Sequence, residues 1–436
     1  MKKRYKVLLG LLVIIVAIVS YSKISESIKI RKFEKVDVLG PTIPTWEFER
    51  IDNENYIQYK SFKDIVYSTE ELQGASKQYY SKYIDYIAPN GKPIRILAQD
   101  KVTDQQLLYA YSVLEFFLDN TEALDKSEVA NNMADKGAII VMPNGADRDG
   151  AIKNSLIGQP QYQNETANPG STWYINNDYS HRDSTFEEIF HLVHGYGIGY
   201  SKTPLGDEVM SNLIKDAQSN ALPKSVLKWG KEGLWGINAR FMLFQWSIEK
   251  GSLESEYIIS VIDAYYGLWE AYDGKGSIYG EYVPKNREEV TTLDPLGLKA
   301  LEHYLPEMIT SMIRIDDSFD GEFKLKFDES NLYTFKSQYY LNAWLQGLRD
   351  TNLTGNDFDN ILIGNAGNNL INGLDGVDIV QFNGNFSEYI IEISGDSLIF
   401  TDTTLSRDGM DTLTNIELFR FRDRDVTIEE MLDLLN

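Results

Sequence analysis

The sequence predicts an α+β chain, with a mostly helical main domain followed by a C-terminal array of short repeats. Three observations carry this prediction. Strand-like and helix-like apolar patterns alternate from residue 92, and helical patterns predominate after residue 184. Three nine-residue units that begin with glycine stand in tandem between residues 355 and 381. The length of 436 residues suits two or three domains at roughly 150 residues each.

The main domain opens with patterns that alternate between strand and helix. Thr103 is expected to cap the first long helix, because a threonine oxygen can accept a backbone N–H of the first turn. Strands are expected at 93–98, 137–143 and 173–176, and helices at 104–118, 127–135 and about 184–194, 206–219, 237–250, 254–270 and 295–314.

The N-terminus has the pattern of an export signal or a membrane anchor. The basic stretch MKKRYK precedes an apolar run from Val7 to Ser20. This run is shorter than the roughly 20 residues of a usual spanning helix, and Ser20-Tyr21-Ser22 is a fair cleavage site. Residues 1–25 are therefore either a cleaved signal or an N-terminal helix that contacts the membrane. In both cases the remaining chain is expected outside the cytoplasm, secreted or anchored to the cell membrane.

Composition divides the rest of the chain into three regions. Residues 26–90 are polar and weakly periodic, which predicts a stalk that leads into the main domain. Residues 91–345 carry the patterns of the main domain, and residues 350–436 carry the repeats and a β-type segment. Within that segment, SEYIIEISGDSLIFTD is expected to form a hairpin.

Charge and cysteine content exclude several classes of function. The net charge of −23 argues against a nucleic-acid partner, because phosphate contacts require a basic surface. The absence of cysteine excludes disulfides and thiolate metal sites. An acidic chain does suit divalent cations, which bind carboxylate and carbonyl oxygens.

The tandem units resemble the hemolysin-type (RTX) calcium-binding repeat G-G-x-G-x-D-x-U-x, which builds a parallel β-roll. The units run from Gly355 to Ile363, from Gly364 to Asn372 and from Gly373 to Gln381. The resemblance implies that the apolar residues at the U position stack inside the roll; they are Leu362, Ile371 and Val380. The constant period favours this interpretation over a Gly/Asn-rich linker.

The same resemblance implies that oxygens of stacked turns bind Ca²⁺. Only Asp378 is acidic at the sixth position, because asparagine stands there in the other two units. Few calcium sites, weaker than those of long arrays, are therefore expected. The candidate calcium-binding residues are Asp357, Asp359, Asn360, Asn369, Asp375 and Asp378.

The predicted helix at 184–194 carries a stripe of ionisable side chains. At about 100° per residue, Glu187, Glu188, His191 and His194 share one side, and apolar residues fill the remaining directions. A helix that is apolar nearly all round is buried, and buried ionisable groups must be paired or bind metal.

Glu187-Glu188-Ile-Phe-His191 resembles the HExxH motif of zinc peptidases, with Glu in place of the first His. The resemblance implies a zincin-like main domain in which Glu187 and His191 bind Zn²⁺ and Glu188 is the catalytic base. His194 is an additional candidate ligand. The thermolysin-like group takes a third ligand from a later helix, where Glu256 is the candidate here. Asp263 would then orient an imidazole from behind.

The resemblance extends over residues 92–270 in the order of elements. The stretches GSTWYINNDY and RDSTFEEIFHLVHGYG are also similar to an uncharacterised bacterial family that often carries such repeats.

Structural explanations of the same residues remain open. Ser184 with Glu187, or Thr185 with Glu188, has the spacing of a capping box. His194 before a glycine can stabilise a helix C-terminus, and His181 and His303 are expected to be structural.

Two functions follow from these alternatives. The first is an exported, calcium-binding, zinc-dependent hydrolase, most consistent with a metallopeptidase that takes a peptide or protein substrate. The second is a non-catalytic surface or adhesive protein with a structural metal site. The sequence leaves open whether the chain is an enzyme.

Overall fold

The computed structural model describes residues 51–67, 70–149, 155–248 and 252–435. The expected signal or anchor at residues 1–25 lies outside these ranges. Within them, no helix is both long and apolar enough to cross a membrane. All described residues belong to one compact unit.

A four-stranded mixed sheet opens the main domain. Strand β1 (Lys82–Ile87) pairs antiparallel with β2 (Pro93–Ala98), and β3 (Ile139–Met142) and β4 (Gln159–Pro160) follow in parallel. The strands expected at 93–98 and 137–143 are confirmed as β2 and β3. Strand β1 lies in the stretch that we expected to be a stalk.

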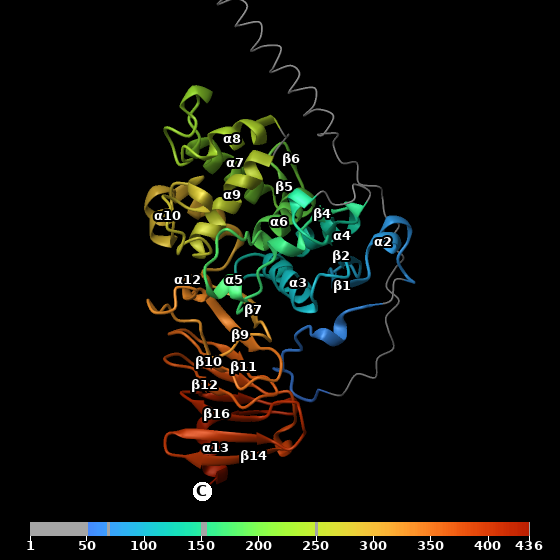
Figure 1. Cartoon of the computed structure of the whole chain (residues 1–436), viewed down its shortest axis with the longest axis vertical. Coiled ribbons are helices and arrows are strands. Elements are labelled where there is room, and N and C mark those ends of the chain that lie inside the picture. The colour runs from blue at the N-terminus through green and yellow to red at the C-terminus, as the bar shows by residue number, and fades with distance from the viewer. Residues whose placement is uncertain (1–50, 68–69, 150–154, 249–251, 436) are drawn as a thin grey trace, which may run out of the picture. The chain divides into compact units, whose positions relative to one another are not determined.

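Helices outnumber strands in the main domain, as the apolar periodicity predicts. Thr103 caps α3 (Asp104–Leu118) by accepting the N–H of Gln106, whose side chain in turn bonds the Thr103 backbone. Figure 1 shows the later helices gathered beside one another in green to gold. The longer helices of the main domain after α3 are α4 (Ser127–Asp135), α6 (Thr185–Leu192), α7 (Glu208–Ala221), α8 (Ala239–Ile248), α9 (Ser252–Tyr265), α10 (Arg287–Leu293) and α11 (Pro295–Tyr304). Two short ones, α5 (Thr172–Ile175) and α12 (Thr334–Ser337), lie among the described residues as well, and α13 (Ile428–Leu435) ends the described chain.

Two expected elements are wrong. The strand expected at 173–176 is a helical turn, α5 (Thr172–Ile175), which Asn177 closes with a left-handed φ of 48°. Asparagine adopts this conformation more readily than most other residues except glycine, so the turn overrides the strand-like pattern. The helix expected at 295–314 ends at Tyr304, because Pro306 cannot donate the next helical hydrogen bond. The following residues form a strand, β7 (Ile309–Ile315).

The C-terminal half contains two six-stranded, mostly parallel sheets. From β7 to β13, successive strands alternate between them, and β14 and β15 form the expected hairpin. One sheet has the order β18 (Asp425–Thr427), β17 (Leu418–Arg420), β13 (Ile379–Gln381), β11 (Ile361–Ile363), β9 (Tyr340–Leu345) and β7. The other has the order β14 (Tyr389–Ser394), β15 (Ser397–Asp402), β16 (Met410–Thr414), β12 (Leu370–Asn372), β10 (Asn352–Thr354) and β8 (Glu322–Lys324).

The nine-residue period sets the register of these sheets. Leu362 pairs with Val380 in one sheet, and Leu353 pairs with Ile371 in the other, so each strand meets the one two units later. Leu362, Ile371 and Val380 are at most 1% exposed, as expected for the U position. Figure 1 shows these strands in orange and red as successive layers. Strands β7 and β9, which precede residue 350, belong to the same sheet as β11 and β13 of the repeats.

The first described residues run along the C-terminal strands. The backbone N–H of Asn53 donates to the carbonyl oxygen of Arg422 over 3.0 Å, and its side chain donates to Asp425. Ile57 exchanges two hydrogen bonds with the side chain of Gln381. This part of the expected stalk is therefore held against the sheets.

Candidate metal centre

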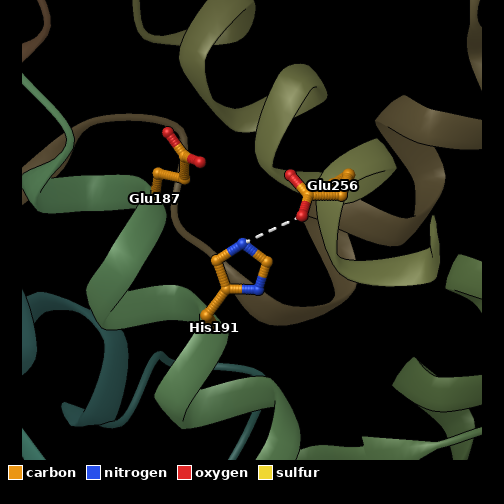
Figure 2. A group of neighbouring side chains, drawn as sticks. All are labelled: Glu187, His191 and Glu256. Atoms are coloured by element: carbon orange, nitrogen blue, oxygen red, sulfur yellow. Dashed lines mark ion pairs between the residues drawn. The ribbon is translucent and has the colours of Figure 1, made fainter. Parts of the chain in front are cut away.

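Helices α6 and α9 bring the candidate ligands together. The apolar side of α6 packs against α3, where Phe186 and Phe190 meet the ring of Phe117 edge-on. Helix α9 packs against α6. Glu187 and His191 lie one turn apart on α6, so both point toward the same side, and Glu256 faces them from α9 (Figure 2).

One ligand atom from each of Glu187, His191 and Glu256 lies within 4.8 Å of the other two. His191 Nε2 lies 3.5 Å from Glu256 Oε1 (Figure 2). The three side chains are 20%, 15% and 14% exposed, so water still reaches them. This group can hold a metal ion.

Arg182 balances the acidic side of the group. Its guanidinium forms an ion pair with Glu187 and lies 3.9 Å from Glu188 and 3.5 Å from Glu165. Burial alone would raise the pKa of Glu187, but the charges of Arg182 and His191 outweigh burial and lower that pKa. Glu187 is therefore ionised at neutral pH.

The pKa of Glu188 is shifted in the opposite direction to that of Glu187. Burial, followed by the charge of Glu187, raises the pKa of Glu188 to about 7. The side-chain amide of Gln159 donates to one Glu188 oxygen. A carboxylate with a pKa near neutrality exchanges a proton readily at neutral pH, which suits a general base.

His191 carries a proton in the metal-free chain at neutral pH. Burial opposes its charge, but Glu256 and the two glutamates of α6 outweigh burial and raise the pKa of His191 to about 9. A metal ion would replace this proton, so its binding would release a proton.

His194 lies outside the group of three. Its Nδ1 is 2.8 Å from Ser255 Oγ, and its ring packs on Tyr200. Burial, followed by the charge of His191, lowers the pKa of His194 to about 3. The helical path continues beyond this residue as a π-helix (Val193–Ile198). A neutral imidazole within a continuing helix does not act as a cation at a helix end, so the dipole explanation is wrong.

The capping explanation for the two glutamates is also wrong. The Ser184 side chain makes no capping hydrogen bond and instead donates to Gln161. The hydroxyl of Thr185 donates to Asp183. Glu187 and Glu188 are thus held by Arg182 and Gln159 rather than by the helix N-terminus.

Asp263 lies near Glu187, and its side chain has a hydrogen bond with Trp269. Burial, followed by the charges of Glu187 and Asp183, raises its pKa well above the ordinary value. It lines a cavity of about 30 Å³ together with Asp183, His181 and Lys336. Aromatic rings form much of the wall, and the His181 ring stacks on Trp173 at 3.4 Å. His303 instead bonds Asp207, which caps α7.

Three residues near the centre were not singled out in the sequence. They are Arg182, Gln159 and Glu281. Burial, followed by the charges of Glu187 and Glu256, raises the pKa of Glu281 to about 7. Arg182 stands just before the acidic helix in the sequence, so its sequence position alone could have identified it as a counter-charge. No periodic pattern connects the other two to α6.

Asparagine amides close the first two repeat turns. Asn360 Oδ1 accepts the N–H of Asn356 over 2.8 Å, and Asn360 Nδ2 donates to Asn356 Oδ1 over 2.9 Å. Asn369 makes the same pair of hydrogen bonds with Asn365. N–H donors therefore engage the side-chain oxygens that a cation would require. The side-chain oxygens of Asn360 and Asn369 are therefore hydrogen-bonded within their own turns.

The third turn has a different arrangement. Asp378 is fully buried; its Oδ1 accepts the N–H of Asn360, and its Oδ2 has no hydrogen-bond partner. A Cβ placed on Gly373 would lie 2.2 Å from both Asp378 Oδ2 and the carbonyl oxygen of Asn415. An unpaired carboxylate oxygen and a carbonyl oxygen therefore face the same space beside Gly373.

The other acidic candidates are dispersed. Asp357 forms a 2.7 Å ion pair with Lys326 on the surface, and its side chain is 50% exposed. Asp359 accepts the N–H of Val377, and Asp375 is exposed. These three carboxylates do not converge with Asp378 in a group of ligands among the described residues.

Comparisons with protein-family models, with curated proteins and with solved structures found no match.

Proposed function

We propose that the chain is an exported, zinc-dependent hydrolase of the metallopeptidase type, with a zincin-like main domain and a C-terminal parallel β-roll. One observation carries the enzymatic part: two carboxylates and an imidazole from α6 and α9 converge within 4.8 Å, next to Glu188. One imidazole and two carboxylates suit zinc, which accepts both donor types. Zinc in such a site supplies a Lewis acid that polarises a carbonyl group.

The roles of the chain's own residues follow from their charges. Glu187, His191 and Glu256 would hold the ion, and Arg182 keeps Glu187 ionised. Glu188 has a pKa of about 7, which burial causes, and it would take a proton from the attacking water and give it to the leaving amine. His194 would pack behind the helix, outside the ligand set.

We propose fewer calcium sites than the three repeats imply. Alternation of the strands between two sheets and the buried U positions support a β-roll. We place calcium only at the Asp378 turn, whose unpaired oxygen and neighbouring carbonyl group fit it. Hydrogen bonds among asparagines would replace calcium in the other two turns.

A second candidate is a non-catalytic surface or adhesive protein with a structural metal site. The position of Arg182 favours this candidate, because its guanidinium forms an ion pair with Glu187 and approaches Glu188. The side-chain amide of Gln159 also donates a hydrogen bond to Glu188. Residues held in this way form a stable network that does not require a substrate.

Metal analysis of the full chain tests the site. One zinc ion per chain is expected after dialysis, and His191→Ala and Glu256→Gln should lose it. Glu302→Gln is the matched control, because it removes one exposed carboxylate from α11 without touching the group. Absence of bound metal from the wild type, or equal retention by all variants, would refute the metal site.

A peptide-library assay then separates the two functions. Glu188→Gln should keep zinc and the fold but lose cleavage by at least roughly 100-fold, because a general base contributes about that much or more. Zinc binding with no cleavage by the wild type would favour the structural alternative. Equal cleavage by wild type and variant would remove Glu188 from the mechanism.

A further inference from the structure

Five large apolar side chains lie exposed within one short segment of the main domain. The segment comprises residues 222–248, which include a 3-10 turn (Val226–Lys228) and helix α8. Its exposed residues, which we call the apolar patch, are Val226 (50% exposed), Leu227 (76%), Ile237 (62%), Phe241 (75%) and Phe244 (55%). A cluster of this kind on a folded domain indicates a surface for binding.

Packing joins the two halves of the patch. A Cβ placed on Gly230 would lie 2.8 Å from Cβ of Arg240 and 3.3 Å from Cα of Ile237, so the loop lies against the start of α8. The indole N–H of Trp229 donates to the carbonyl oxygen of Pro223 over 2.8 Å and closes this loop. The loop that carries Leu227 therefore packs, at Gly230, against the start of the helix that carries Phe241.

The segment that carries the patch is basic, although the chain as a whole is acidic. Four exposed cations stand in the segment, and Glu232 is its one acidic residue. Lys228 forms an ion pair with Glu232 over 2.9 Å. The other three cations do not take part in this pair. The whole chain carries a net charge of −23, so the charge of this segment is opposite in sign to that of the remainder. The cations are Lys224, Lys228, Lys231 and Arg240.

We propose that the apolar patch is a membrane-contact surface that lies on an anionic lipid bilayer. Apolar and aromatic side chains insert at the boundary between headgroups and acyl chains, and flanking lysine and arginine bind lipid phosphates. Charge complementarity selects an anionic surface. The acidic remainder of the chain is repelled from that surface, so repulsion and attraction together favour one orientation.

The chain that precedes the described residues is compatible with this contact. The apolar run ends at Ser20, and the described structure begins at Ile51. The intervening residues span at most roughly 100 Å when extended. A chain anchored through its N-terminus would keep the patch at high local concentration near the bilayer. If the signal is cleaved, the patch would be the remaining membrane contact.

The absence of cysteine in the sequence permits a direct test on the full chain. An environment-sensitive nitrobenzoxadiazole dye is attached to Leu227→Cys and, as the matched control, to Leu405→Cys. Leu405 is 94% exposed and belongs to the acidic C-terminal region, so both substitutions leave the core intact. Each labelled chain is mixed with phosphatidylcholine vesicles, with or without phosphatidylserine.

The dye at residue 227 should shift to shorter wavelength and brighten severalfold with phosphatidylserine vesicles, and the dye at residue 405 should not change. Adding Lys228→Glu and Lys231→Glu should reduce the response at 227. An unchanged dye at 227 would overturn the proposal, whether or not the chain sediments with vesicles. A dye at 227 that brightens without lipid as protein concentration rises would also overturn it, in favour of self-association.

Discussion

The buried carboxylate of Asp378 should make the calcium-free chain less stable as pH rises. Burial raises its pKa to about 7; the Asn360 N–H opposes the rise, and Glu417 and Asp359 add to it. Below about pH 4 the group is protonated in both the folded and unfolded chains. Between about pH 4 and pH 7 the unfolded chain releases the proton first, so stability falls; above about pH 7 the loss is constant.

The substitution Asp378→Asn tests this reasoning. A folded pKa of about 7 against an ordinary 3.8 corresponds to at most about 4 kcal/mol. We therefore expect Asp378→Asn to stabilise the calcium-free chain by about 2–4 kcal/mol at pH 8 and to change it little at pH 4. The asparagine keeps an oxygen for the Asn360 N–H and carries no charge.

Urea unfolding of the full chain, followed by circular dichroism with a calcium chelator at pH 4 and pH 8, measures the difference. Asp375→Asn is the matched control, because this carboxylate belongs to the same turn and is exposed. With calcium at pH 8, the wild type should gain stability and Asp378→Asn should not. A variant destabilised equally at both pH values would refute the argument.

Three other predictions concern the core and the turns. Asn369→Ala should cost about 2–4 kcal/mol in urea unfolding, because it leaves the Asn365 N–H and the Thr351 carbonyl group unpaired, and added calcium should not restore it. Leu362→Ala should cost about 2–5 kcal/mol, since it removes most of a fully buried side chain; a loss under about 1 kcal/mol would refute that burial. Burial lowers the pKa of Lys126 to about 7, so the unfolding free energy of the wild type relative to Lys126→Met should rise from pH 7 to pH 10; a flat difference would contradict the burial.

Local patterns predicted much of the fold because they depend on neighbours in sequence. Helix α3 occupies the expected residues, since its periodicity and the Thr103 cap act within a few residues. The repeats set their own register, because a constant period places every second unit in the same sheet. The helix expected at 295–314 failed where β7 joins a sheet, because the gain from strand pairing depends on distant residues.

The candidate site shows the same division between local and distant effects. Helical spacing placed Glu187, Glu188 and His191 on one side of α6, and the structure keeps them there. The resemblance to the thermolysin-like group and helical spacing point to Glu256 on a later helix, and the structure brings this residue to His191. His194 and Asp263 also satisfied the spacing, but they lie outside the ligand group.

The sequence alone determined which residues share a helix side and which repeat positions face inward, because 3.6-residue and nine-residue periods are properties of local backbone geometry. Only the tertiary structure decided which charged groups meet and how they are protonated. Arg182 keeps Glu187 ionised, while burial raises the pKa of Glu188 to about 7, although the two glutamates are adjacent in sequence. Asn360 is satisfied within its turn, whereas Asp378 retains a buried unpaired oxygen. Desolvation and charge interactions depend on distances in space, and packing alone sets those distances.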